Sequence, residues 1–147
     1  MQFRSFTIIE VTCTKSIIQG ILPFTAPEVF HTYKFTKKSD IYSFGIVMYL
    51  MGTGELPFGD RQFDSDLLCN IMDGLRPLIP DSAPEKYKKL AEMCWDADPD
   101  KRPDADRIKD FISTALSDKS DIWETIYHNN VRLLPCLEKG SKPTRDV

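Results

Sequence analysis

The chain has 147 residues, of which 41% are hydrophobic and 28% are charged, so it can build one domain with an apolar core but not two. Its net charge of −3 offers no bulk attraction to nucleic acid or to an anionic membrane, and we expect neither as a partner. No cysteines form a Cys-x-x-Cys pair and only two histidines are present, which argues against a zinc site or a disulfide framework and favours a cytoplasmic, intracellular setting.

The first part of the chain is rich in β-branched and aromatic residues. In residues 1–19 the apolar positions alternate poorly, so the pattern predicts either a short strand or an unpaired segment. Residues 20–27 are expected to form a loop, because a glycine permits unusual backbone angles and the two prolines each fix φ and remove a donor. Pro27 can also start a short helix through Phe30.

A helix is predicted over residues 39–51. Ser39 or Asp40 can cap it, and Gly52 or Gly54 can end it. The segment is apolar on most of its sides, which is typical of a helix at the centre of a core. Little else in the chain can surround it, so we expect one side to be exposed and to permit self-association or binding of a partner, unless residues 1–19 cover part of the gap.

Three amphipathic helices are predicted next, at 64–73, 85–95 and 104–116. In the second of them the apolar residues recur at i, i+3, i+4, i+7 and i+8, and Cys94 is expected to be a packed core thiol. The acidic stretch 96–106 lacks the glycine and glutamate of a calcium loop, so a solvated turn is predicted. One more short helix is possible at 122–127, and the polar residues 139–147 are expected to be disordered.

Four motifs occur in order along the chain: Gly20-x-x-Pro23-Phe24-x-Ala26-Pro27-Glu28, Ser39-Asp40-Ile41-Tyr42-Ser43-Phe44-Gly45, Gly54-x-x-Pro57-Phe58 and Cys94-Trp95-x-x-Asp98-Pro99-x-x-Arg102-Pro103. In this order and at this spacing they resemble the C-terminal lobe of a protein kinase domain, nearest to the tyrosine-kinase-like group. The resemblance implies a mainly α fold over 20–116, the helical C-terminal lobe without the N-terminal lobe and catalytic loop. Residues 1–19 are then a non-matching segment and 117–147 a partly disordered tail.

The resemblance also assigns roles to residues. It places the substrate loop at Gly20, Ile21, Leu22, Pro23 and Phe24, and structural roles at Ala26, Pro27, Glu28, Asp40, Gly45, Trp95 and Arg102. In the family the glutamate of Ala-Pro-Glu pairs with the arginine of Arg-Pro, which implies a buried pair here; the alternative is two surface charges.

Two of these positions are open to other interpretations. Asp40 corresponds to the aspartate that holds the catalytic loop in the family, and its alternative role is that of an acid at a helix start. Ile21 lacks the hydroxyl that many serine/threonine kinases carry at this position, which puts a normal substrate contact in doubt.

The phosphate-binding and catalytic motifs of the family are missing from the sequence. No Gly-rich loop, no His-Arg-Asp and no Asp-Phe-Gly occurs in it, so we expect no catalytic, cofactor-binding or metal residue in this chain. ATP and Mg²⁺ are implied only for the complete family domain, whose activity is ATP-dependent protein phosphorylation in signal transduction. The chain is expected to be inactive alone. It is expected to bind a protein substrate or a partner chain.

Two alternatives remain open at this point. One is a functional enzyme whose N-terminal half is encoded upstream in the gene, and the other is a non-catalytic docking or scaffold module that uses the kinase lobe.

Overall fold

The computed structural model describes residues 11–13, 16–18 and 22–117. Two short strands come first, β1 (Val11–Cys13) and β2 (Ser16–Ile18), and they pair antiparallel with Val11 opposite Ile18. The β-prone start of the chain therefore forms a strand that is paired with a second one. The helix predicted at 122–127 and the disorder predicted at 139–147 lie outside the described residues.

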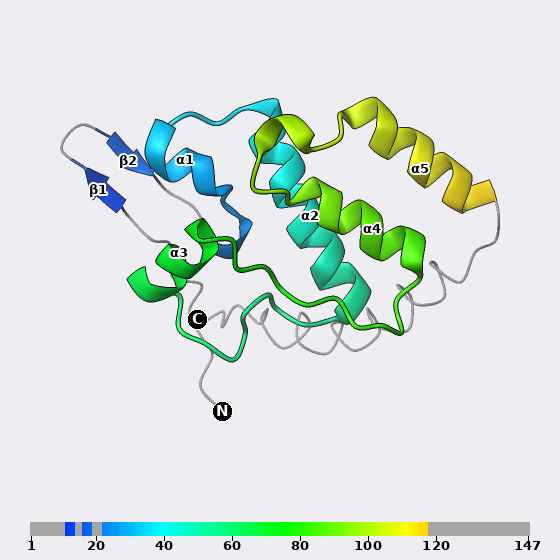
Figure 1. Cartoon of the computed structure of the whole chain (residues 1–147), viewed down its shortest axis with the longest axis horizontal. Helices are drawn as coiled ribbons and strands as arrows, with labels where there is room; N and C mark the ends of the chain where they lie inside the picture. The colour runs from blue at the N-terminus through cyan, green and yellow to red at the C-terminus, as the bar shows by residue number, and fades with distance from the viewer. Residues whose placement is uncertain (1–10, 14–15, 19–21, 118–147) are drawn as a thin grey trace, which may run out of the picture.

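All the other elements of the described chain are helices, which confirms the mainly α fold. The elements are η1 (Leu22–Phe24), α1 (Pro27–Thr32), α2 (Lys37–Thr53), α3 (Ser65–Met72), α4 (Glu85–Cys94), η2 (Pro99–Lys101) and α5 (Ala105–Ser117). The three amphipathic helices lie where their periodicity predicted them. Figure 1 shows α2 and α4 at the centre, α5 on one side, and α1, α3 and the strands on the other.

The start of α2 differs from the prediction. The helix begins at Lys37 rather than at 39, and its cap is Thr36 instead of Ser39 or Asp40. The Thr36 hydroxyl accepts a hydrogen bond from Ser39 N at 3.2 Å, and the Ser39 hydroxyl accepts one from Thr36 N at 2.8 Å. This reciprocal capping box satisfies two backbone donors at once, which favours the earlier start.

Helix α2 ends at Thr53 and α1 at Thr32, each two residues beyond its predicted end, whereas the predicted cap Gly54 is confirmed. Gly52 belongs to α2, and Gly54 ends the helix in the left-handed conformation at φ 71°, a region that glycine enters at no steric cost. Helix α1 runs past Phe30 to Thr32, where Tyr33 at φ 55° closes it with a hydrogen bond to Val29 O.

Helices α2 and α4 pack closely at the centre of the lobe. A Cβ atom at Gly45 would lie 2.8 Å from Cys94 Cβ, and one at Gly52 would lie 2.8 Å from the ring of Tyr87. The Tyr87 hydroxyl donates to Met48 O at 2.6 Å, and burial raises the pKa of this hydroxyl, so that it remains a donor. Cys94 is fully buried, and burial raises the pKa of its thiol to about 12, which confirms the packed core thiol.

Substitution of Gly45 tests this packing. Alanine normally stabilises a helix interior relative to glycine by roughly 0.5–1 kcal/mol. At Gly45 the added methyl meets Cys94 and the α4 backbone, so we expect Gly45→Ala to destabilise the lobe by about 1–3 kcal/mol in urea unfolding. The exposed control Asn70→Ala should change stability by less than about 0.5 kcal/mol. A more stable Gly45→Ala protein would show that the helices do not pack this closely.

Candidate functional site

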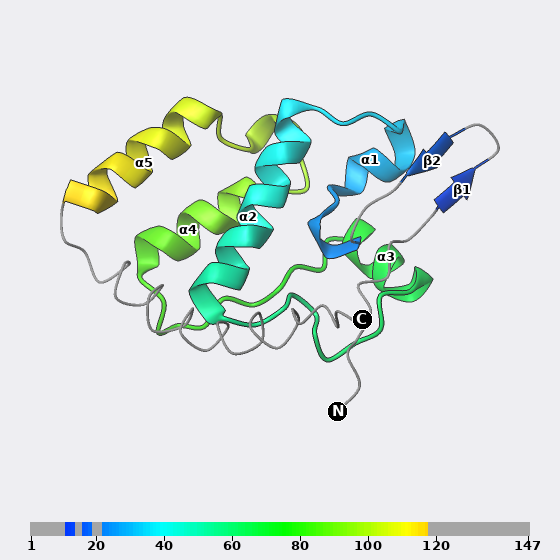
Figure 2. The same ribbon diagram turned by 180° about the vertical axis from the view of Figure 1, so that it is seen from behind.

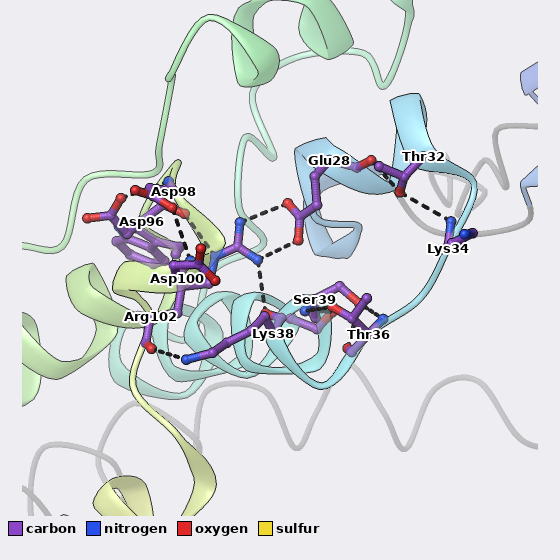
Figure 3. Close-up of polar contacts among 12 residues, drawn as sticks. Glu28, Thr32, Lys34, Thr36, Lys38, Ser39, Asp96, Asp98, Asp100 and Arg102 are labelled. Atoms are coloured by element: carbon purple, nitrogen blue, oxygen red, sulfur yellow. Dashed lines mark hydrogen bonds and ion pairs between the residues drawn. The ribbon is translucent and has the colours of Figure 1, made fainter.

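The most buried charge among the described residues belongs to Arg102, whose side chain is 0% exposed. Its Nη1 and Nη2 atoms donate to the two carboxylate oxygens of Glu28 at 2.6 and 2.8 Å (Figure 3). The two residues are 74 positions apart in the sequence, and Glu28 is 21% exposed. The structure confirms the predicted pair and excludes the alternative of two surface charges. A bidentate pair of this kind is both strong and directional.

Local structure presents each partner to the other. Pro27 opens α1, so Glu28 lies in the first turn, where a carboxylate is favoured by the helix dipole. Arg102 directly follows η2, whose backbone is shaped by aspartates: Asp96 accepts from Asp98 N at 2.8 Å and Asp98 accepts from Asp100 N at 3.0 Å. The acidic stretch is therefore a capped turn, and the described residues contain no cluster of three or more possible metal ligands.

Backbone carbonyls complete the surroundings of the Arg102 guanidinium. Arg102 Nη1 donates to Lys38 O and Nε donates to Asp96 O, both at 2.9 Å. Lys38 returns a bond from its Nζ to Arg102 O at 2.5 Å, so the start of α2 and the residue after η2 are linked in both directions (Figure 3). A buried charge is tolerated only where its donors are satisfied in this way.

A second arginine lies next to this pair. The guanidinium carbons of Arg76 and Arg102 each lie 5.2 Å from the centroid of the Tyr42 ring of α2. Arg76 also donates to Trp95 O at 2.9 Å and to Ile71 O at 2.8 Å, which joins the end of α3 to the end of α4. Sequence reasoning missed Arg76 and Lys38, because their partners are backbone carbonyls and a ring, which leave no motif.

The Glu28 carboxyl is acidified by these neighbours. Burial alone would raise its pKa, but the hydrogen bonds and positive charge of Arg102, with a smaller contribution from Arg76, outweigh burial and lower the pKa below its ordinary value of 4.5. Glu28 is therefore an anion at neutral pH and is paired with Arg102 there.

The segment expected to be the substrate loop lies beside α2. Leu22 and Pro23 are buried in η1, Phe24 is half-buried, and Gly20 and Ile21 lie outside the described residues. The Ser43 hydroxyl donates to Phe24 O at 2.7 Å, which ties this segment to the second turn of α2. Ala26, next along the chain, is buried in the core.

The remaining structural positions are spread over the lobe. Gly45 lies at the contact of α2 with α4, and Trp95 is buried at the end of α4, where its carbonyl accepts from Arg76. Asp40 is exposed in the first turn of α2, a position where an acid is favoured by the helix dipole. The structure thus brings Glu28 and Arg102 together and leaves Asp40 apart from them.

Comparison with known proteins identifies the class. A sequence model of the family described as "Protein tyrosine and serine/threonine kinase" matches residues 9–112. The match begins within the segment 1–19 and ends shortly before 116. The chain belongs to the protein kinase family, as its motifs, its helical lobe and the Glu28–Arg102 pair predict.

The individual relatives agree with a tyrosine-kinase-like origin. The chain is 40% identical over 103 residues to the dual specificity protein kinase shkE of Dictyostelium discoideum, a match that covers 68% of this chain and 14% of that protein. It is 39% identical over 93 residues to mitogen-activated protein kinase kinase kinase 10 of Mus musculus, covering 62% and 10%.

A solved structure gives the same assignment. The cryo-EM structure of the AtMLKL3 tetramer is similar at a TM-score of 0.51 and 41% identity, over 55% of this chain and 15% of that one. The chain therefore spans about a seventh or less of the length of these relatives.

The Glu28–Arg102 pair can be tested by a double-mutant cycle. Glu28→Ala leaves a buried guanidinium without its counter-ion, and Arg102→Ala leaves the carboxylate without its donors, so we expect each to cost about 3–5 kcal/mol of unfolding free energy. The double variant should cost less than the sum, because the second substitution removes the stranded partner. Additive losses in urea unfolding would mean that the two side chains do not interact.

The lowered pKa of Glu28 also predicts a pH dependence. Because the folded-state pKa lies below the unfolded-state value, the pair contributes its full stability above about pH 4.5 and loses it as the pH falls through the folded pKa. The difference in unfolding free energy between the native chain and Glu28→Gln should therefore be constant from pH 7 to 5 and shrink below pH 4.5. A constant difference down to pH 3 would contradict the assignment.

Proposed function

We propose that this chain supplies the substrate-side lobe of a protein-kinase-family domain and does not transfer phosphate by itself. The observation that carries the proposal is the Glu28–Arg102 pair, which holds the start of α1 against η2 and so fixes the end of the substrate loop. The bond from Ser43 to Phe24 O adds a second anchor for the same loop on α2. A protein substrate or a partner chain would meet the lobe beside this loop, at whose end Phe24 is half-buried.

The side chains of this chain do not supply the ligands that ATP and Mg²⁺ require. The described residues hold no cluster of three carboxylate, histidine or cysteine side chains, and the sequence contains neither a Gly-rich phosphate loop nor Asp-Phe-Gly. In a complete domain of the family these groups lie in other segments. No step of phosphoryl transfer is assigned to residues of this chain, and its contribution is to position a peptide.

A non-catalytic docking or scaffold role is the second candidate. It is favoured by the outward side of α2, where Val47 and Met51 are 36% and 37% exposed in a helix that otherwise forms the centre of the core. Such a module would bind a partner chain or a second copy without catalysis. The same apolar side also permits self-association.

We also propose an intracellular setting for the chain. Cys69 and Cys94 are free thiols, which suits a reducing compartment. None of the helices within the described residues has the length and apolar character needed to cross a bilayer.

The proposal predicts that purified chain binds no nucleotide. We expect ATP with Mg²⁺ to leave the melting temperature unchanged at concentrations up to several millimolar, because no phosphate or metal ligand set is available. Incubation with a generic protein substrate should give no incorporation of labelled phosphate. A melting shift that grows with ATP concentration, or phosphorylation that EDTA abolishes, would disprove the proposal. A known active kinase under the same conditions serves as the control.

A further inference from the structure

The segments at the two ends of α2 carry opposite charge. Residues 29–40, at its start, contain three lysines and one aspartate, a net charge of +2. Residues 54–66, which follow it, contain four acidic residues and one arginine, a net charge of −3. The helix has 17 residues and is about 25 Å long, and both views show the connections before and after it at opposite ends of the lobe (Figures 1 and 2).

The basic end, which we define as Lys34, Phe35 and Lys37, lies on a short connection that is fixed on both sides. Tyr33 closes α1, and the capping box of Thr36 opens α2. Both lysines are exposed, and Phe35 between them is 63% exposed. Aromatic residues are enriched in protein interfaces, and here one is held on the surface between two cations.

The acidic end, which we define as Glu55, Leu56 and Asp60, presents the opposite charge around an apolar residue. Pro57 is fully buried, which fixes this connection on the core, whereas Leu56 is 38% exposed and the two acids are exposed. Burial raises the pKa of the Tyr49 hydroxyl, and the charges of the two carboxylates raise it further. Both carboxylates therefore lie near the last turns of α2.

The charges of the two ends find no counter-ion within the described part of the chain. None of the side chains of Lys34, Lys37, Glu55 and Asp60 takes part in an ion pair there. The basic end cannot reach the acidic end of the same molecule, because α2 separates them by about 25 Å. Two copies can bring unlike ends together, and opposite charge steers such an encounter whereas like ends repel.

We propose that the basic end of one copy binds the acidic end of a second copy. Phe35 then meets Leu56 at the centre of the contact, and the lysines face the carboxylates around it. A second copy is favoured over an unrelated acidic partner because this chain itself carries the complementary surface, with opposite charge around an apolar residue. The contact uses the ends of α2 and not its outward side, and it does not depend on whether the chain takes part in phosphoryl transfer.

Sedimentation of the full chain tests the association. Two short connections bury less than the roughly 1,200 Å² of a stable interface, so we expect weak binding that depends on salt. In about 20 mM salt the average mass should rise above 16.9 kDa as the concentration approaches about 0.5 mM. About 0.3 M salt should weaken the association at least about tenfold, because the Debye length falls from about 20 Å to about 6 Å. A chain that stays monomeric in low salt overturns the proposal.

Exchange of the charges tests which ends meet. Lys34→Glu/Lys37→Glu has two acidic ends and Glu55→Lys/Asp60→Lys has two basic ends, so each should be monomeric alone, and an equimolar mixture should associate. All four positions are exposed, so thermal melts should show both variants folded. Association of either variant alone, or folded variants whose mixture stays monomeric, overturns the proposal.

A matched control separates the basic end from net charge. Lys86→Glu/Lys89→Glu, at two exposed positions of α4, changes the net charge as much as Lys34→Glu/Lys37→Glu does and should associate like the native chain. Its loss of association would mean that net charge alone decides, which overturns the proposal.

The apolar centre gives an independent readout. Phe35→Ala leaves every charge in place and should weaken the association at least about fivefold. Leu78→Ala removes a residue that is 83% exposed between α3 and α4 and should leave the association unchanged. Equal effects of the two substitutions overturn the proposal.

Discussion

The lobe depends on one constraint, namely that the guanidinium of Arg102 is fully buried and carries a charge. Such a group is stable only when every donor has a partner, and its partners come from three places: the Glu28 carboxylate at the start of α1, Lys38 O at the start of α2, and Asp96 O in the turn before η2. Fixing one side chain therefore fixes three segments that are far apart in the sequence. The Tyr42 ring also contacts Arg76, which joins the ends of α3 and α4 to the same point.

Helix α2 serves the core on one side and presents an apolar strip on the other. Gly45 and Gly52 let α4 approach closely, because any side chain there would meet Cys94 or Tyr87 at 2.8 Å. Val47 and Met51 fall on the opposite side and are 36% and 37% exposed. The helix is thus apolar on most of its sides, and its close contact with α4 accounts for one of them.

The chain belongs to the protein kinase family and has a helical lobe, yet the phosphate-binding and metal-binding motifs of that family do not occur in its sequence. Function resides in such groups rather than in the fold that carries them. The pair of Glu28 and Arg102 has a structural role. The lowered pKa of the Glu28 carboxyl keeps it ionised for the ion pair, and no proton transfer is involved.

The sequence by itself determined where the helices lie, because the apolar periodicity of α3, α4 and α5 is a local property that each segment carries alone. It misplaced the start of α2, since Thr36, Ser39 and Asp40 are all acceptable caps and only the backbone geometry selects Thr36. The pair of Glu28 and Arg102 followed from resemblance to a family, because no local pattern joins residues 74 positions apart. Tertiary structure alone decided the places of Arg76 and Lys38 and the side of α2 that faces outward, since carbonyl groups and packing neighbours come from the folded chain and not from residue type.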